Sequence, residues 1–187
     1  EHEHVYTIGK RGKQSDILLP KDKLIEKNID VHWIDRGGQT TYHGPGQLIL
    51  YPILNIGKLG LNPLRYIRLL EQLVIITLNE FEINAYCVPG LTGVWVDNAK
   101  IASIGIKVTK SVTTHGLSLN VNPNLSYFEG IIACGEFEKS VTSMQTCSNR
   151  LITVDQVIPS IIDNFSQVFG FNMRLSSNEI SKELKIM

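Results

Sequence analysis

Residues 36–51 read Arg-Gly-Gly-Gln-Thr-Thr-Tyr-His-Gly-Pro-Gly-Gln-Leu-Ile-Leu-Tyr. The stretch sets four glycines and a proline among side chains that donate hydrogen bonds, and it runs into the apolar residues 48–50. Fixing so many glycines costs backbone entropy, which favours a ligand-binding loop attached to a strand over a plain spacer. Gly37 and Gly38 let another group approach the main chain, and Arg36 can bind a carboxylate or phosphate as a planar fork. A glycine-rich turn between two strands is the alternative interpretation.

The composition of the chain is that of a globular protein. Its 187 residues suffice for one domain with a substantial core, and 43% of them are apolar while 19% are charged. The formal net charge is zero, so the basic excess of a general nucleic-acid binder is missing. The longest apolar runs are far shorter than a membrane span. Three cysteines, at positions 87, 134 and 147, indicate thiols in a reducing compartment rather than a disulfide framework.

Strands are predicted from alternating or apolar runs. They are expected at 5–10, 31–35, 48–54 and 117–121, with a β-hairpin formed by 94–96 and 100–108 around the turn at Asp97 and Asn98. The strand at 31–35 would deliver Arg36 to the glycine-rich loop.

Two long helices are predicted. Asn62 followed by Pro63 is a favourable helix start, and apolar residues at helical spacing extend it over 63–82. Thr153 and Gln156 form a capping box for a second helix that ends at Gly170, and Pro159 should bend or delay it. Strands interleaved with two long helices predict a layered α/β or α+β domain.

The glycine-rich stretch resembles the signature of the lipoyl(octanoyl) transferase family in residues 36–38, 41–47 and 51. The resemblance implies an α/β (α+β) fold, a mixed β-sheet sandwich packed with helices, similar to the catalytic domain of biotin and lipoate protein ligases. It further implies that residues 1–187 form a single acyltransferase catalytic domain. Family members usually have a few tens of residues before this point, so we expect the chain to lack its N-terminal part.

The resemblance also implies a catalytic pair, Cys134 and Lys100. Taken alone, a cysteine in apolar company is usually a core residue, and a lysine at a strand end usually points to solvent. In the family, the nucleophile lies in a Pro-Cys-Gly segment and a strand lysine pairs with it; here Ala133 replaces the proline. A nearby ammonium favours the thiolate form of a thiol. Cys87 and Cys147 match no position that the family uses for chemistry.

Fifteen further residues are expected to bind substrate. Ser103 to Gly105 would face Gly116 and its neighbours across an acyl channel, with main-chain N–H groups near Gly116 available to a thioester oxyanion. His115 and His43 each have a structural alternative, as a satisfied histidine or as a brace for the Gly-Pro-Gly turn. The expected set is Arg36, Gly37, Gly38, Gln39, Thr40, Thr41, Tyr42, His43, Ser103, Ile104, Gly105, His115, Gly116, Leu117 and Ser118.

The function implied by the resemblance is transfer of an octanoyl group from octanoyl-acyl carrier protein to a specific lysine of lipoyl-accepting domains, through a cysteine thioester. The acceptors would be lipoyl domains of 2-oxoacid dehydrogenases and the glycine-cleavage carrier protein. The alternatives are an ATP-dependent lipoate or biotin protein ligase and a non-catalytic acyl-binding protein. No cofactor or metal is expected, since His2 and His4 lack the further ligands of a zinc site. No nucleic-acid or membrane partner is expected either, and the default state is a monomer, cytoplasmic in a bacterium and mitochondrial or plastid in a eukaryote.

Overall fold

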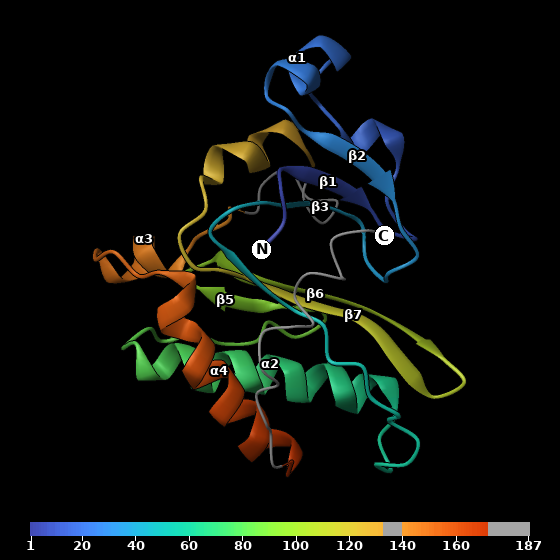
Figure 1. The fold of residues 1–187 in the computed structure, drawn as a ribbon, viewed down its shortest axis with the longest axis vertical. Helices are drawn as coiled ribbons and strands as arrows, with labels where there is room; N and C mark the ends of the chain where they lie inside the picture. Colours follow the sequence, from blue (N-terminus) through green and yellow to red (C-terminus); the bar gives the residue numbers. More distant parts are fainter. Residues whose placement is uncertain (133–139, 172–187) are drawn as a thin grey trace, which may run out of the picture.

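The protein folds around two β-sheets that face each other. The structure, a computed structural model, describes residues 1–132 and 140–171. The smaller sheet has the order β2-β1-β3, built from β1 (Val5–Ile8), β2 (Asp30–Trp33) and β3 (Thr40–His43). It is mixed, because β1 pairs in parallel with β2 and antiparallel with β3. Figure 1 shows it above the larger sheet.

The larger sheet is antiparallel and has the order β4-β7-β6-β5. Its strands are β4 (Gln47–Leu50), β5 (Val94–Val96), β6 (Ala99–Thr109) and β7 (Val112–Asn120). The hairpin predicted around residues 97 and 98 is confirmed, and both turn residues have positive φ (48° and 77°), as a tight turn between twisted strands requires. The strand expected at 48–54 ends at Leu50, and the one expected at 117–121 begins at Val112.

Two long helices cover the outer face of the larger sheet (Figure 1) and pack against each other. Helix α2 (Pro63–Glu80) begins as predicted, with the Asn62 side chain accepting the Arg65 N–H at 2.8 Å. Helix α4 (Val154–Phe169) has the predicted capping box and ends at Gly170, whose φ of 72° suits glycine. Pro159 was expected to bend or delay this helix; the start at Val154 excludes the delay, because the capping box nucleates the first turn ahead of the proline.

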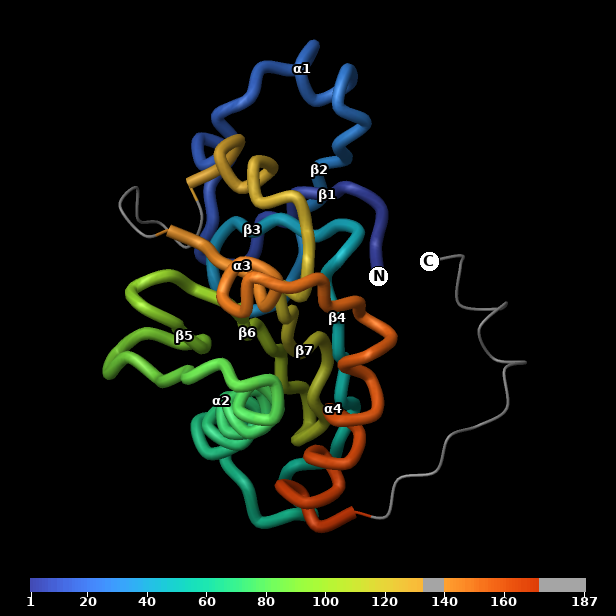
Figure 2. Tube along the Cα trace, turned by 90° about the vertical axis from the view of Figure 1, so that its left-hand side faces the viewer, coloured from blue at the N-terminus to red at the C-terminus, as the bar shows by residue number. Residues whose placement is uncertain are grey.

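Each sheet has its own buried core, and Figure 2 shows the two layers from the side. The main core lies between the larger sheet and α2 and α4, and includes Leu70, Leu73, Ile101, Leu119 and Phe165. The second core joins the smaller sheet to the 3-10 helix η2 (Leu125–Gly130) and contains Tyr6, Ile29, Tyr42, Phe128 and Ile131. The two cores therefore do not fill the space between the two sheets.

The short elements were not predicted from the sequence. They are η1 (Gln14–Asp16), α1 (Lys21–Glu26), β3, η2 and α3 (Met144–Ser148). Segments this short carry too little periodicity to be recognised, and β3 exists because it pairs with β1 rather than through strand propensity. Within residues 1–132 and 140–171, no helix combines the length and the apolar character needed to cross a membrane.

Candidate active site

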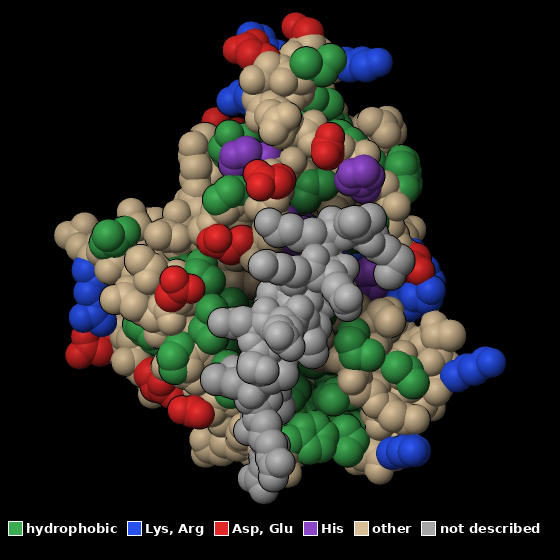
Figure 3. All heavy atoms as spheres, in the orientation of Figure 1, with side chains coloured by type: hydrophobic (Ala, Val, Ile, Leu, Met, Phe, Trp, Pro, Cys, Tyr) green, Lys and Arg blue, Asp and Glu red, His purple; other side chains and the backbone are tan. Residues whose placement is uncertain are grey.

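A cavity of about 1040 Å³ lies between the two sheets. The smaller sheet contributes Val5, Thr7 and His32 to its wall, and the larger sheet contributes Ile49 and residues 103–105 and 115–118. All five histidines of the chain line the cavity. Figure 3 shows histidine side chains in the upper and middle part of one face of the molecule. The candidate residues among its lining are Arg36, Gly38, Gln39, Thr40, Thr41, His43, Lys100, Ser103, Ile104, Gly105, His115, Gly116, Leu117 and Ser118.

Two of the expected residues lie elsewhere. Tyr42 is fully buried in the second core, where its hydroxyl is 2.8 Å from His4 Nδ1. It alternates with Thr41 and His43 along β3, so it points to the opposite face of the sheet. Gly37 uses its N–H to bind the carbonyl of Ile106 at 2.9 Å. Both residues therefore help to place the cavity wall without forming it.

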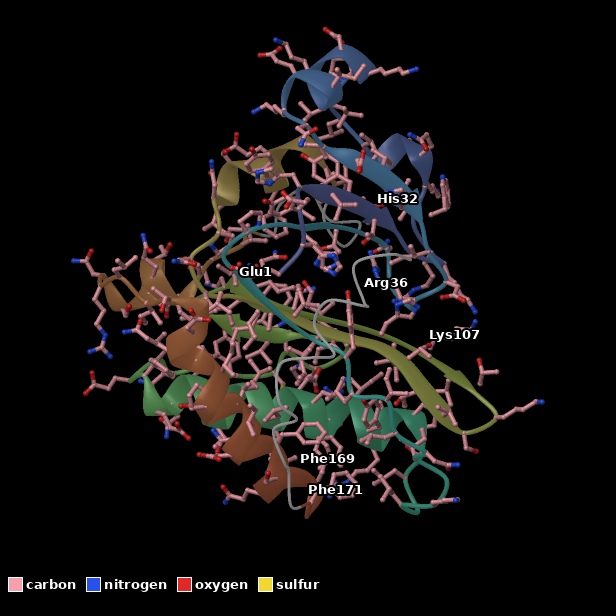
Figure 4. All side chains as sticks on the ribbon, viewed as in Figure 1. Glu1, His32, Arg36, Lys107, Phe169 and Phe171 are labelled. Carbon is pink, nitrogen blue, oxygen red and sulfur yellow. The ribbon has the colours of Figure 1, made fainter. Side chains whose placement is uncertain are left out.

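Arg36 holds the glycine-rich loop against β1. Its side chain is buried, and Nη2 donates to the carbonyl and the hydroxyl oxygen of Thr7 at 2.7 and 2.8 Å, while Nη1 donates to the Gly37 carbonyl at 3.1 Å. Figure 4 shows Arg36 between the two sheets. The expected fork is present, but the groups that it binds belong to the chain itself.

The same loop docks on the far half of β6. An ideal Cβ at Gly105 would lie 2.7 Å from the Gly37 carbonyl oxygen, closer than real Cβ atoms come to a backbone atom, and 3.1 Å from Arg36 Cδ. Glycine at 105 therefore lets the loop lie directly on the strand. The pairing of β5 with β6 ends at Ala102, and further along β6 the Ile106 carbonyl accepts the Gly37 N–H at 2.9 Å.

Asp35 ties the loop to both strands of the β6–β7 hairpin. Its carboxylate accepts hydrogen bonds from Lys107 Nζ on β6 and from His115 Nε2 on β7, the latter at 2.7 Å. These two hydrogen bonds lower the pKa of the Asp35 carboxyl to about 2. His115 lies on the cavity wall in a left-handed backbone conformation (φ 60°). These contacts support the structural alternative for His115, a histidine whose hydrogen bond holds the fold together.

His43 is a neutral histidine in this arrangement. Gln47 Nε2 donates to Asn120 Oδ1 at 2.9 Å and to the Tyr42 carbonyl at 3.3 Å, which orients the amide so that Gln47 Oε1 accepts from His43 Nδ1 at 3.2 Å. Burial, and next the positive charge of Arg36, lower the pKa of His43 to about 4. At neutral pH His43 Nε2 is accordingly an unprotonated acceptor on a residue that lines the cavity.

Lys100 is buried at the start of β6, with 9% of its surface exposed. Its Nζ lies 4.9 Å from the centroid of the Trp95 ring, a cation–π contact between two residues paired across β5 and β6. Its main chain is fixed as well, because Lys100 N donates to the Ser140 carbonyl and Thr142 N donates to the Lys100 carbonyl. Cys134, the expected nucleophile, lies outside the described residues.

Gly116 lets β7 lie close to the end of β4 and the residues after it. An ideal Cβ there would lie 2.0 Å from the Leu50 carbonyl oxygen, so only glycine fits. Gly116 also faces Gly105 across the β6–β7 ladder. The two glycines therefore let neighbouring chain segments pack directly on the β6–β7 ladder, and both residues line the cavity.

The other two cysteines sit in structural surroundings. Burial, and next the charge of Glu71, raise the pKa of Cys87, which disfavours its thiolate. Cys147 Sγ lies 3.4 Å from Thr142 Oγ1. In the described part of the chain, no three His, Cys, Asp or Glu side chains group closely enough to hold a metal ion, and His2 Nε2 lies 2.8 Å from the Tyr51 hydroxyl.

Several residues that shape the cavity carried no signal in the sequence. Thr7 and Asp35 are common residue types outside the glycine-rich motif. Thr7 nevertheless accepts the hydrogen bonds of Arg36, and Asp35 ties the loop to His115. Trp95 was assigned only to a strand, and its contact with Lys100 depends on the β5–β6 register, which shifts between Val94 and Trp95. These roles follow from pairings between segments that are distant in sequence.

Comparison with known proteins places the chain in a family. Residues 1–166 match the family model of the lipoyl protein ligase A/B catalytic domain. An octanoyltransferase of Caldicellulosiruptor saccharolyticus is 41% identical over 186 residues, covering 98% of this chain and 79% of the relative. An octanoyltransferase of Solibacter usitatus is 43% identical over 173 residues, covering 92% of this chain and 78% of the relative.

Solved structures confirm the predicted fold. A lipoate-protein ligase A bound with ATP superposes with a TM-score of 0.73 at 15% identity, covering 98% of this chain and 76% of the other. A biotin protein ligase from Aquifex aeolicus in complex with biotin and ATP gives a TM-score of 0.58 at 18% identity, covering 88% of this chain and 70% of the other. At these identities the likeness concerns the fold alone, whereas the sequence matches are much closer: the chain belongs to the octanoyltransferase family, a family of acyltransferase enzymes.

Proposed function

We propose that this protein transfers an octanoyl group from octanoyl-acyl carrier protein to the ε-amino group of a specific lysine on a lipoyl-accepting domain. The observation that carries the proposal is the convergence of three distant segments on one cavity. The first segment contributes Arg36, residues 38–41 and His43 to its lining, the second contributes Lys100 and residues 103–105, and the third contributes residues 115–118. We infer the octanoyl group from the names of the relatives, which are octanoyltransferases, and we propose that the cavity binds it.

The reaction proceeds in two acyl transfers. The Cys134 thiolate attacks the carbonyl carbon of the donor thioester, a new carbon–sulfur bond forms, and the carrier thiolate leaves and takes up a proton. The acceptor amine then attacks the octanoyl-cysteine, forming the amide and releasing the Cys134 thiolate while the amine loses a proton. No ATP is required, because the thioester already stores the energy of the acyl bond.

Lys100 serves both halves of this cycle. As an ammonium it favours the Cys134 thiolate before acylation. Once acylation has removed that negative charge, Lys100 can give up its proton and accept one from the incoming amine. Its burial beside Trp95 supports the role, since a lysine with a structural role only would keep its charged end in solvent.

The contacts of Arg36 favour the transferase over an ATP-dependent ligase. In a ligase, an arginine of this loop would grip phosphates. Here its two Nη atoms are engaged by Thr7 and Gly37 within the chain, so phosphate binding would have to displace those bonds. A non-catalytic acyl-binding protein remains the other alternative, and the same experiment separates all three.

Intact-mass spectrometry after incubation with octanoyl-acyl carrier protein tests the proposal. We expect one octanoyl adduct, located on Cys134 by peptide mapping, that disappears when an acceptor lipoyl domain is added. Cys134→Ala should abolish both the adduct and the transfer, while Cys147→Ser serves as the matched control. Transfer that survives Cys134→Ala and needs ATP would indicate a ligase, and octanoate bound without any adduct or transfer would indicate a binding protein.

The partners and the compartment follow from the same proposal. The donor is octanoyl-acyl carrier protein, and the acceptors are lipoyl domains of 2-oxoacid dehydrogenases or the glycine-cleavage carrier protein. Because the named octanoyltransferase relatives are bacterial, we place the reaction in a bacterial cytoplasm. Fractionation of the source cells, with activity assayed in each fraction, checks the compartment.

A further inference from the structure

Glu71 is a fully buried carboxylate that the reaction described above does not use. It lies on α2, on the face that packs against β5 and β6, and none of its surface is exposed. Taking an ionised carboxylate out of water costs several kcal/mol unless hydrogen bonds compensate it. The compensation comes from Arg68 Nη1, which donates to Oε2 at 2.6 Å, and from the main-chain N–H of Gly93, which donates to Oε1 at 3.0 Å. The Cys87 thiol is a third neighbour, and its hydrogen bond with Glu71 contributes to the raised pKa of Cys87.

The bond to Gly93 reaches the strand segment that flanks Lys100. Gly93 has a φ of +125°, a conformation that other residues rarely adopt. An ideal Cβ at Gly93 would lie 2.7 Å from the Ala102 carbonyl oxygen and 3.3 Å from Lys100 Cε. A side chain at residue 93 would therefore press on the aliphatic part of the Lys100 side chain, so the lysine occupies the space that glycine leaves open.

The segment that Glu71 holds also borders the cavity. Residues 90–92, immediately before Gly93, line it together with Lys100. On the other side of Gly93, the chain continues through the register shift at Val94 and Trp95, which puts the Trp95 ring over Lys100 Nζ. Gly93 and Trp95 thus belong to one short segment that flanks the Lys100 side chain. Glu71 accepts the hydrogen bond from the Gly93 N–H of this segment.

We propose that Glu71 is a positioning residue for Lys100: through its hydrogen bond to the Gly93 N–H it holds the segment from residue 90 to Trp95 against the lysine side chain and so keeps the ammonium directed into the cavity. The proposal rests on the proposed function, in which that ammonium favours the Cys134 thiolate. Glu71 itself touches neither substrate nor Lys100 Nζ in this role and acts through the segment it binds.

The substitution Glu71→Gln tests the hydrogen bond with little change of shape. The glutamine amide offers one acceptor oxygen, whereas Arg68 and the Gly93 N–H are both donors, so one of them loses its partner. Arg68→Ala is the matched control, because it removes the other hydrogen bond of the same carboxylate and leaves the Gly93 bond in place. In the double variant the competing Arg68 donor is gone, so glutamine Oε1 can accept the Gly93 N–H again, beside the Cys87 thiol, and the Gly93 bond should return.

The measured quantity is the rate of alkylation of Cys134 by iodoacetamide as a function of pH, followed by peptide mass spectrometry so that Cys87 and Cys147 stay in place. We expect Glu71→Gln to move the midpoint of this profile upward by about 0.5 pH unit, a loss of about threefold in rate below the midpoint. Arg68→Ala should keep the wild-type midpoint, and Arg68→Ala with Glu71→Gln should return to it. A merely structural role would lower the melting temperature of these variants without moving the midpoint.

Two results would overturn the proposal. One is an unchanged midpoint in Glu71→Gln; the other is an equal shift in Arg68→Ala, which would point to general loosening of α2. Should Glu71→Gln fail to fold, Glu71→Asp, which shortens the side chain by one methylene, takes its place with a smaller expected shift, and no shift there rejects the idea. The variant Lys100→Met, measured in parallel, separates the proposed function from the role of Glu71. If Lys100→Met leaves the alkylation profile unchanged, the proposed function fails. If Lys100→Met shifts the profile and Glu71→Gln does not, only the role of Glu71 fails.

Discussion

Arg36 and Lys100 are two buried cations that line the same cavity from opposite sheets, and they are held in different ways. Arg36 directs its Nη atoms into hydrogen bonds with Thr7 and Gly37 of its own layer. Lys100 lies against an aromatic ring and a glycine, and its main chain is fixed by residues 140 and 142. A planar guanidinium with several donors is suited to holding chain segments together by hydrogen bonds, while a compact ammonium that can lose its proton is suited to acid–base catalysis. The comparison separates a cation that builds the site from one that acts in it.

Removing the acting cation should give the largest effect. Lys100→Met should lower the rate of octanoyl transfer by a factor of about 10²–10⁴, the usual contribution of acid–base catalysis, with a small change in melting temperature. Lys107→Met is the matched control, because Lys107 lies on the same strand and binds Asp35 instead. Single-turnover transfer measured with a saturating donor checks this; equal losses in both variants would contradict the assignment.

Removing the building cation should act mainly on stability. Arg36→Met leaves the buried Thr7 carbonyl and hydroxyl without their donor, and we expect a loss of about 3 kcal/mol in the free energy of unfolding. Arg36→Lys should recover less than half of it, since one ammonium cannot reproduce the two-pronged geometry. Urea denaturation followed by circular dichroism measures both variants. A stable Arg36→Met protein that fails only in transfer would reverse the comparison.

His43 sharpens the comparison through pH. Its pKa of about 4 in the folded protein lies below the ordinary 6.5, so between these values the unfolded chain binds more protons than the folded one. Stability should therefore be complete above pH 6.5 and fall as the pH drops toward 4, by about 2.5 kcal/mol at pH 4.5. The free energy of unfolding of wild type and His43→Gln, compared between pH 7.5 and 4.5, isolates this contribution. Parallel curves for the two proteins would show that His43 is not the group responsible.

Asp35 should give the smallest effect, at the exposed edge of the loop. Its pKa of about 2 lies below the ordinary 3.8, so its contribution to stability is present above pH 4 and is lost as the pH falls through 2. High salt should weaken it, because the pair with Lys107 is open to solvent. Asp35→Asn should therefore shift the acid melting curve slightly at low salt and leave it unshifted in 1 M NaCl. A large shift that salt does not change would mean that the carboxylate is buried in solution.

The long elements of this fold were predictable because their signals are local. Asn62 with Pro63 marks the start of α2, and Thr153 with Gln156 marks the start of α4, through hydrogen bonds that span only three residues. Strand β3 and the short helix α3 were missed, because their stability comes from pairing and packing with distant segments. Among the expected site residues, Tyr42 packs in the second core, because the alternation of β3 points Thr41 and His43 toward the cavity and Tyr42 away from it.

The sequence by itself determined the family, the two long helices and the segments that meet at the cavity, because a motif of unusual residue types and a capping box are both written in consecutive positions. Only the tertiary structure decided that Arg36 binds Thr7, that His115 and Lys107 share Asp35, and that Glu71 reaches Gly93 beside Lys100. These partners are 22 or more residues apart in the chain. Which of many possible donors reaches a given buried acceptor depends on strand register and on close approaches that glycine permits, and neither is encoded in local spacing.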